Sequence, residues 1–149
     1  PDAIGEQHVA VLPTALRRRY DFPLLLFAHP RHPAGGIDKG LAKARALSEG
    51  TATIVVYKMG EKGAVTFADG QEIHTGIWPV KALKPTGAGD SFMAGLVTGL
   101  AYGQSLRDAI LRGSACASIT VSRPGCAPAM ADTPTLEKFM ADHAGPTDL

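Results

Sequence analysis

The stretch LKPTGAGDSFMAGLVTGL, residues 83–100, decides how the rest of the sequence is interpreted. Its apolar residues are spaced for one buried face, which predicts a helix from about Asp90 to Tyr102 with Gly103 at its end. The first turn of a helix presents unpaired N–H groups and the positive end of its dipole, and glycines just before Asp90 let that backbone approach an anion closely. Asp90 is therefore either a cap for this helix or a base held beside a bound phosphate.

Composition and charge limit the class of protein. The chain has 149 residues, of which 45% are hydrophobic and 19% charged, as is typical of a soluble globular domain or part of one. A net charge of +1 argues against a nucleic-acid or anionic-membrane partner, and no apolar run approaches the ~20 residues of a membrane span. Two cysteines form no disulfide framework, so a cytoplasmic location is expected. The chain begins at Pro1 rather than Met, which suggests a fragment or a processed product.

Periodicity and turn residues predict the elements that precede this stretch. Asp38 is placed to cap a helix that ends at Gly50, and Asp69-Gly70 suits the type I′ turn of a hairpin. The strands are expected at 23–27, 53–57, 64–68, 71–78 and 79–83.

Two further helices are expected after it. Ser105 with Asp108 predicts a variant of the capping box at the start of one, and Thr133 with Pro134 predicts the cap and first position of the other. An order of helix, strand, hairpin, strand, helix and helix is an α/β order.

Two glycine-containing stretches have the features of phosphate loops. KMGEKG (58–63) follows a buried strand, and TGAGD (86–90) precedes a helix. In a phosphoryl transfer, the N–H groups of residues 87–89 would stabilise negative charge on the transferred group, and Asp90 would accept the proton of the attacking hydroxyl. Lys58 is either a further positive charge near the phosphates or a solvated lysine at a strand end, and the first stretch alone is also compatible with a simple turn.

The second stretch carries a family resemblance. Residues 84–90 with the SFMAG that follows closely resemble the second signature of the ribokinase-like (PfkB) carbohydrate kinases, D-[TP]-T-G-A-G-D. The x-x-G-x-x-G at 58–63, the small-residue helix at 113–121 and SRPGCAP at 122–128, which is similar to the family's R-x-G-[AC] loop, extend the resemblance from about Ala52 to Met140. It implies an α/β fold, the nucleotide-binding half of a ribokinase-like three-layer α/β/α sandwich.

The resemblance divides the chain into three segments. Residues 1–37 stay unassigned, 38–144 are expected to form the C-terminal part of a PfkB-type kinase domain, and 145–149 a loose tail. Members of the family are much longer, and their N-terminal part supplies the sugar-binding residues, a lid and an acidic motif near magnesium. Residues 1–37 do not resemble that part, so this half alone would lack what turnover needs. A homodimer is expected for the full-length enzyme.

The resemblance also implies roles for individual residues. Asp90 is similar in position to the catalytic base, and the anion hole would be formed by Gly87, Ala88 and Gly89. ATP with Mg²⁺ would be bound by Lys58, Gly60, Gly63, Thr86 and Ser114. A monovalent-cation loop, which contributes mostly backbone carbonyls, would include Thr86, Thr120, Arg123 and Gly125.

The first signature position departs from the family, which usually has Asp where this chain has Lys84. In the family that Asp helps to hold a potassium-like ion beside the anion hole. A lysine ammonium can occupy the same space and supply the charge itself, so a weaker dependence on K⁺ is expected here than in relatives.

Only the similarity of short sequence stretches indicates the substrate. VVYKMGEKGAVTF, LKPTGAGDSFMAG and GCAPAM most resemble the bacterial 5-dehydro-2-deoxygluconokinases of myo-inositol breakdown, a branch of this family. Ribose, fructose and 2-dehydro-3-deoxygluconate remain alternative substrates. A truncated nucleotide-binding remnant without phosphotransfer is the alternative from another functional class.

Several other residues are of types that often have functional roles, but the sequence favours no such role for them. His29 and His32 have a metal-like spacing, but prolines flank them and no further ligand lies nearby in the sequence. His74 is expected at the surface of the hairpin, whereas Cys116 and Trp78 are expected in the core.

Overall fold

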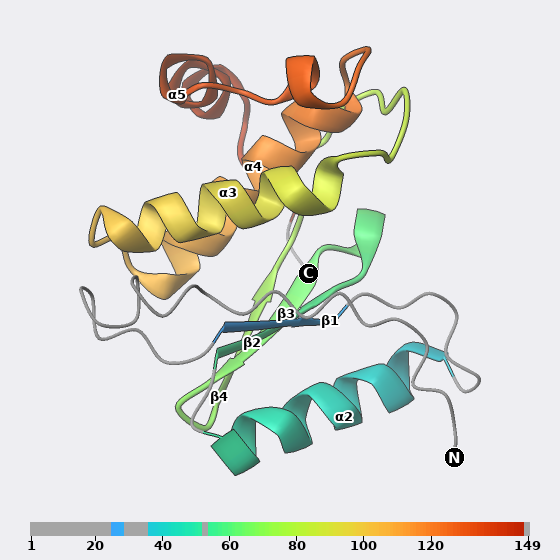
Figure 1. The fold of residues 1–149 in the computed structure, drawn as a ribbon, viewed down its shortest axis with the longest axis vertical. Coiled ribbons are helices and arrows are strands. Elements are labelled where there is room, and N and C mark those ends of the chain that lie inside the picture. The colour runs from blue at the N-terminus through green and yellow to red at the C-terminus, as the bar shows by residue number, and fades with distance from the viewer. Residues whose placement is uncertain (1–24, 29–35, 52–53, 148–149) are drawn as a thin grey trace. The chain divides into compact units, whose positions relative to one another are not determined.

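The computed structural model describes residues 25–28, 36–51 and 54–147, and the chain divides into two compact units, 1–74 and 75–149 (Figure 1). The strand expected at 23–27 is described from Leu25 onward, and the paired histidines at 29 and 32 lie outside the described residues. None of the described helices is long and apolar enough to cross a membrane.

In its described part, the N-terminal unit is a four-stranded sheet in the order β1-β2-β3-β4 together with helix α2. The elements are β1 (Leu25–Ala28), α2 (Gly36–Thr51), β2 (Ile54–Lys58), β3 (Ala64–Ala68) and β4 (Gln71–Thr75). Strands β1 and β2 are parallel, so the chain must cross over between them, and α2 is that crossover. Strands β2 and β3 are antiparallel, with Val56 opposite Thr66.

One face of this sheet packs against α2. Alternate strand residues share a face, and Val55, Tyr57, Val65 and Phe67 form a buried cluster with Ala44 of the helix. Figure 1 shows α2 lying along the sheet. Four partly buried hydrophobic side chains pack against this cluster: Ile37, Leu41, Leu47 and Met59.

The hairpin turn and strand β3 follow the sequence prediction, but the start of α2 and the end of β4 do not. Asp69 has φ +51° and Gly70 φ +72°, as a type I′ turn requires. Helix α2 begins at Gly36, so the predicted cap Asp38 lies inside its first turn. Strand β4 ends at Thr75, and the strand predicted at 79–83 is wrong.

The backbone partners explain that missing strand. Pro79 has no N–H to donate to a ladder. The N–H groups of Leu83 and Lys84 both donate to the carbonyl of Val121, at 2.7 and 3.3 Å, rather than to a neighbouring strand. This segment is therefore held by the end of a helix.

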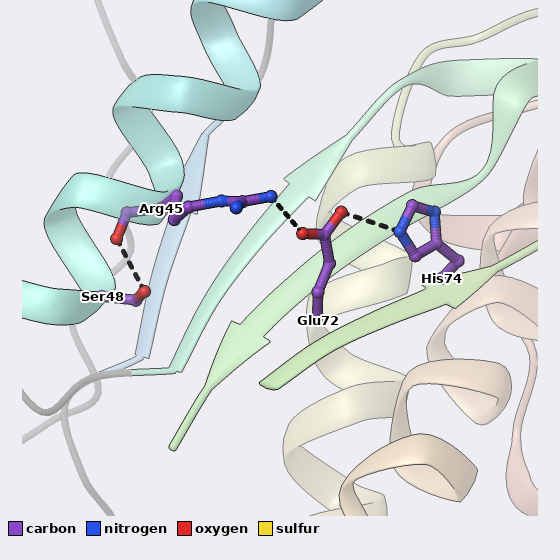
Figure 2. Close-up of polar contacts among 4 residues, drawn as sticks. All are labelled: Arg45, Ser48, Glu72 and His74. Carbon is purple, nitrogen blue, oxygen red and sulfur yellow. Dashed lines mark hydrogen bonds and ion pairs between the residues drawn. The ribbon is translucent and has the colours of Figure 1, made fainter. Parts of the chain in front are cut away.

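A polar cluster on the surface of the N-terminal unit joins α2 to β4 (Figure 2). The Arg45 guanidinium forms an ion pair with Glu72, whose other carboxylate oxygen lies 2.8 Å from His74 Nε2. The His74 side chain is 52% exposed, which confirms the surface position expected for it. Exposed ion pairs of this kind contribute about 0–1 kcal/mol to the free energy of unfolding, so the cluster stabilises the unit only slightly.

The C-terminal unit is helical. Its elements are α3 (Ala88–Ala101), α4 (Leu106–Val121), a short 3₁₀ helix, η2 (Ala127–Ala129), and α5 (Thr133–Asp142). Figure 1 shows α3 and α4 side by side, and glycines permit this close approach. A Cβ added to Gly113 would lie 2.7 Å from the Phe92 carbonyl oxygen, and one added to Gly95 would lie 2.8 Å from the Cys116 Sγ.

The cap predicted for α4 is confirmed. Ser105 is the N-cap, and its Oγ accepts the Asp108 N–H at 3.1 Å. The Ser105 hydroxyl also donates to the Asp108 carboxylate at 2.6 Å, so the two side chains are joined directly.

Trp78 anchors the core of this unit, as expected. It is 5% exposed, packs with Ala115, Cys116, Ile119 and Leu136, and donates its indole N–H to the Leu111 carbonyl at 3.2 Å. Cys116 is likewise buried. In the segment 145–149, predicted as a loose tail, the Thr147 N–H donates to the Ile77 carbonyl at 2.8 Å.

The cap of α5 differs from the sequence prediction. Asp132 is the N-cap and its carboxylate accepts the Thr135 N–H at 3.0 Å, so Thr133 is already the first helical residue. Aspartate competes well for this position because an ionised carboxylate also interacts favourably with the helix dipole.

This cap should weaken in acid. Hydrogen bonds from the Thr135 hydroxyl and N–H hold the pKa of Asp132 below its usual value. Its contribution to stability is therefore complete above about pH 4, the unfolded value, and is lost as the pH falls through the lower folded value. We expect a small loss of melting temperature in acid that is reduced in Asp132→Asn, because asparagine caps without titrating. Parallel circular dichroism melts at neutral and acidic pH measure it, and identical pH profiles of both chains would contradict it.

Candidate active site

The loop before α3 leaves backbone donors open. Gly87 is the N-cap of α3 with φ +85°, a left-handed conformation that glycine adopts at little cost. The Ala88 N–H donates to the Pro85 carbonyl at 3.2 Å. Within the described part of the chain, the N–H groups of Gly87, Gly89 and Asp90 have no acceptor. The three predicted anion-hole donors are thus not equivalent, since that of Ala88 is used inside the loop.

Asp90 is the third residue of α3, and its side chain is exposed. The N-terminus of α3 has no side-chain cap, and no described residue donates to the Asp90 carboxylate. The positive end of the helix dipole favours a carboxylate here. The capping alternative is therefore not what the structure contains, and a role as base stays a prediction that this open carboxylate supports.

A buried polar network behind Asp90 holds the first turn of α3 against α4. The Thr120 hydroxyl donates to Ser91 Oγ at 2.8 Å, and both hydroxyls lie 3.0 Å from the Cys116 carbonyl oxygen. Ser91 and Thr120 are almost completely buried. Burial raises the pKa of the Cys116 thiol, with Arg112 offsetting part of that, which fits a structural thiol. Ser91 was not among the expected site residues, and its signal was a hydroxyl directly after Asp90.

The loop after α4 contacts the anion-hole loop. A Cβ added to Gly87 would lie 2.6 Å from the Cys126 Sγ and 3.5 Å from the Thr120 Cγ2. Gly125 has φ +87°, which lets this loop turn back, and Arg123 beside it is exposed. The structure thus brings Thr120 and Cys126 next to the predicted anion hole.

The metal-loop role of Thr120 stays a prediction. Its hydroxyl belongs to the buried network, and its carbonyl accepts the N–H groups of Ser122 and Arg123 at the end of α4. In the described part of the chain, no group of three or more His, Cys, Asp or Glu side chains is arranged to hold a metal ion.

Ser114 lies in the interior of the C-terminal unit. It is 5% exposed, and its hydroxyl donates to the Gly76 carbonyl at 3.1 Å. The Ser118 hydroxyl makes the same kind of bond one turn later, to the Trp78 carbonyl at 2.9 Å. Both serines therefore fasten α4 to the segment after β4, and the Ser114 side chain is already engaged.

The other predicted nucleotide-binding residues lie in the N-terminal unit. Lys58 ends β2, and a one-turn 3₁₀ helix, η1 (Gly60–Lys62), follows it. Gly60 and Gly63 have φ +64° and +78°, values that favour glycine. The Met59 N–H donates to the Gly63 carbonyl at 2.8 Å, which closes the loop. Both glycines are thus required by the turn itself, so their presence does not by itself indicate a ligand.

A family model matches the part of the chain that contains the candidate site. The model of the pfkB family carbohydrate kinases matches residues 28–134, which include the loop, both packed helices and the strand–turn at β2. The chain belongs to the pfkB family of carbohydrate kinases. The match begins within the segment 1–37 that the sequence analysis left unassigned.

Two curated relatives carry the same name. A 5-dehydro-2-deoxygluconokinase of Photobacterium profundum is 37% identical over 107 residues, which are 71% of this chain and 32% of the relative. One of Bacillus thuringiensis (strain Al Hakam) is 39% identical over 90 residues, 60% of this chain and 27% of the relative. The chain therefore spans about a third of the length of these pfkB kinases.

Solved structures show the ribokinase-like α/β fold. Arabidopsis thaliana ribokinase, solved with ribose and ATP, has a TM-score of 0.65 at 26% identity over 78% of this chain and 40% of its own. Fructokinase of Vibrio cholerae O395, solved with fructose, ADP and calcium, has a TM-score of 0.60 at 27% identity over 69% of this chain and 34% of its own. The predicted fold class is thus confirmed.

Proposed function

We propose that this chain is the nucleotide-binding and phosphoryl-transfer half of a kinase that phosphorylates a hydroxyl of a sugar or sugar acid with ATP. The observation that carries the proposal is the open carboxylate of Asp90 beside the unpaired N–H groups of Gly87 and Gly89. A binding-only loop needs the donors but not a carboxylate, which would repel the phosphates.

In this reaction the substrate hydroxyl oxygen attacks the γ-phosphorus of ATP. A P–O bond to the substrate forms, the bond to the bridging oxygen of ADP breaks, and the Asp90 carboxylate takes the hydroxyl proton. The N–H groups at Gly87 and Gly89 stabilise the charge on the transferred group. The buried Ser91–Thr120 network keeps this first turn of α3 in place.

The loop fits the polyphosphate of ATP because its free N–H groups lie at a helix N-terminus. When bound, Mg²⁺ neutralises charge on the phosphates. A ribokinase-family protein of Escherichia coli was solved with ATP and Mg²⁺, and at 22% identity it supports the fold alone. Lys58, Gly60 and Gly63 stay predicted contacts of the nucleotide.

The substrate is proposed from the relatives. Both curated relatives named above are 5-dehydro-2-deoxygluconokinases, which supports 5-dehydro-2-deoxygluconate and a place in myo-inositol catabolism. Ribose, fructose and 2-dehydro-3-deoxygluconate stay the alternatives. A cytoplasmic location, a homodimer of the full-length enzyme and the absence of nucleic-acid partners remain predictions.

Gly87→Ala should weaken the binding of a magnesium-bound non-hydrolysable ATP analogue by about tenfold or more. An L-residue in the left-handed region costs roughly 1–2 kcal/mol, which is about a factor of ten, and the new Cβ would also displace the Cys126 thiol. Calorimetric titration measures the affinity. The control is Gly103→Ala, which has φ +77° but open space around it, so it carries the strain without touching the loop.

Either result is informative about the loop. If Gly103→Ala keeps the wild-type affinity while Gly87→Ala loses it, the loop binds the nucleotide. Equal affinities in the wild type and in Gly87→Ala would contradict the proposal, and no binding by any folded chain would favour the structural remnant. Phosphoryl transfer to 5-dehydro-2-deoxygluconate, ribose and fructose, assayed with the complete gene product, then identifies the substrate.

A further inference from the structure

Lys84 is held in place at both its backbone and its side chain. Its N–H donates to the Val121 carbonyl at 3.3 Å, which ties it to the last residue of α4. Its side chain folds back along the loop, and Nζ donates to the Thr86 carbonyl at 3.4 Å. The residue is half-buried. The ammonium therefore lies on the residue directly before Gly87.

The charge of this ammonium is not neutralised by the site. Among the described residues, none forms an ion pair with Lys84, so no carboxylate contacts its ammonium. The unpaired N–H groups of Gly87 and Gly89 follow within the same loop. A full positive charge beside these donors increases the affinity of the loop for an anion, because charge-assisted hydrogen bonds are stronger than neutral ones.

A monovalent metal ion does not fit here as the family implies. Such an ion needs several oxygen ligands, and backbone carbonyls commonly supply them for K⁺. The Thr86 carbonyl already accepts from the ammonium, and the carbonyl of Thr120 accepts from Arg123. A metal ion beside these oxygens would also face the positive charge of Lys84.

We propose that Lys84 is an electrostatic positioning residue whose tethered ammonium, held on the Thr86 carbonyl, replaces a monovalent metal ion beside the anion-binding loop. The proposal rests on the proposed function, since it assigns the charge to the site that binds phosphate. It predicts a phosphate loop that does not distinguish K⁺ from Na⁺.

The first measurement is thermal unfolding of the whole chain in equal concentrations of KCl, NaCl and tetramethylammonium chloride. The wild type is expected to melt at the same temperature in K⁺ and Na⁺. Lys84→Asp places an anionic ligand next to the freed Thr86 carbonyl, so K⁺ should raise its melting temperature over Na⁺ by a few degrees. Lys81→Asp is the matched control, because Lys81 is an exposed lysine of the same segment and the charge change is identical.

The second measurement is the affinity for the magnesium-bound ATP analogue. Lys84→Met should bind about tenfold more weakly in either salt, Lys84→Arg should recover most of that loss, and K⁺ but not Na⁺ should restore Lys84→Asp. If Lys84 had only a structural role, Lys84→Asp would show no difference between K⁺ and Na⁺. Selective stabilisation of the wild type by K⁺, or unchanged affinity in Lys84→Met, overturns the proposal.

The two measurements separate this proposal from the proposed function. If the folded wild type binds no nucleotide in any salt, the proposed function fails. The melting temperatures still decide the role of Lys84, because a K⁺-selective gain in Lys84→Asp supports it and the same temperature in both salts overturns it. If Lys84→Asp does not fold, a K⁺-selective gain in the wild type overturns the proposal and equal melting in both salts supports it.

Discussion

Asp90→Asn is expected to reduce phosphoryl transfer by about 10²–10⁴-fold, the usual contribution of a positioned general base. Asparagine has nearly the same shape but cannot take the proton of the attacking hydroxyl. The affinity for the magnesium-bound ATP analogue should stay the same or rise slightly, since a negative charge beside the phosphates is removed. Turnover is measured as ADP release by the complete gene product, and affinity by calorimetry on this chain.

Asp108→Asn is the matched control for this variant. Asp108 and Asp90 are both the third residue of their helices, after the N-caps Ser105 and Gly87. Asp108→Asn therefore changes the same interaction with a helix dipole at a helix that lacks the anion loop. We expect transfer at the wild-type rate with Asp108→Asn. Equal loss in both variants would indicate that the helix start, and not a base, is affected.

The second large effect concerns stability. Gly113→Val is expected to destabilise the chain by about 3 kcal/mol, the upper end of the cost of overpacking a core. The new Cβ would lie 2.7 Å from the Phe92 carbonyl oxygen and 3.3 Å from the Leu96 N, both backbone atoms that a rotamer change cannot move. Helices α3 and α4 must then separate. Urea unfolding followed by circular dichroism measures the loss.

The control for Gly113→Val lies on the same helix. Ala117 is half-buried on α4, so Ala117→Val introduces the same side chain at a position that is partly open to solvent. It should cost less than about 1 kcal/mol, mostly through the lower helix propensity of valine. Similar losses in both variants would mean that helix propensity, rather than the contact between α3 and α4, sets the stability.

Signals between neighbouring residues were sufficient for much of the fold. The Asp69-Gly70 turn needs only two residues that accept positive φ, and the capping of α4 by Ser105 depends on Asp108 three residues later. The family signature at 84–90 is equally local, and it led to the ribokinase-like fold that the solved structures share. Such features are determined by the sequence itself because their partners lie within one turn of chain.

Contacts between distant segments were decided by the tertiary structure. Ser114 was expected at the nucleotide, yet its hydroxyl bonds to the Gly76 carbonyl 38 residues away. The expected strand at 79–83 is absent because Leu83 and Lys84 find the Val121 carbonyl instead. A polar group takes the partner that packing brings near, and periodicity carries no information about that partner.

The candidate site also combines features set by the local sequence with features set by tertiary packing. The sequence by itself determined that a glycine-rich turn with a carboxylate opens a helix, since residue types alone set that conformation. Only the tertiary structure decided that the Cys126 thiol packs against Gly87, because the two residues lie on different loops. It also decided that the Lys84 N–H donates to the Val121 carbonyl at the end of α4. These outcomes depend on which atoms meet when α3 and α4 pack, because free energy is minimised over the whole fold rather than along the chain.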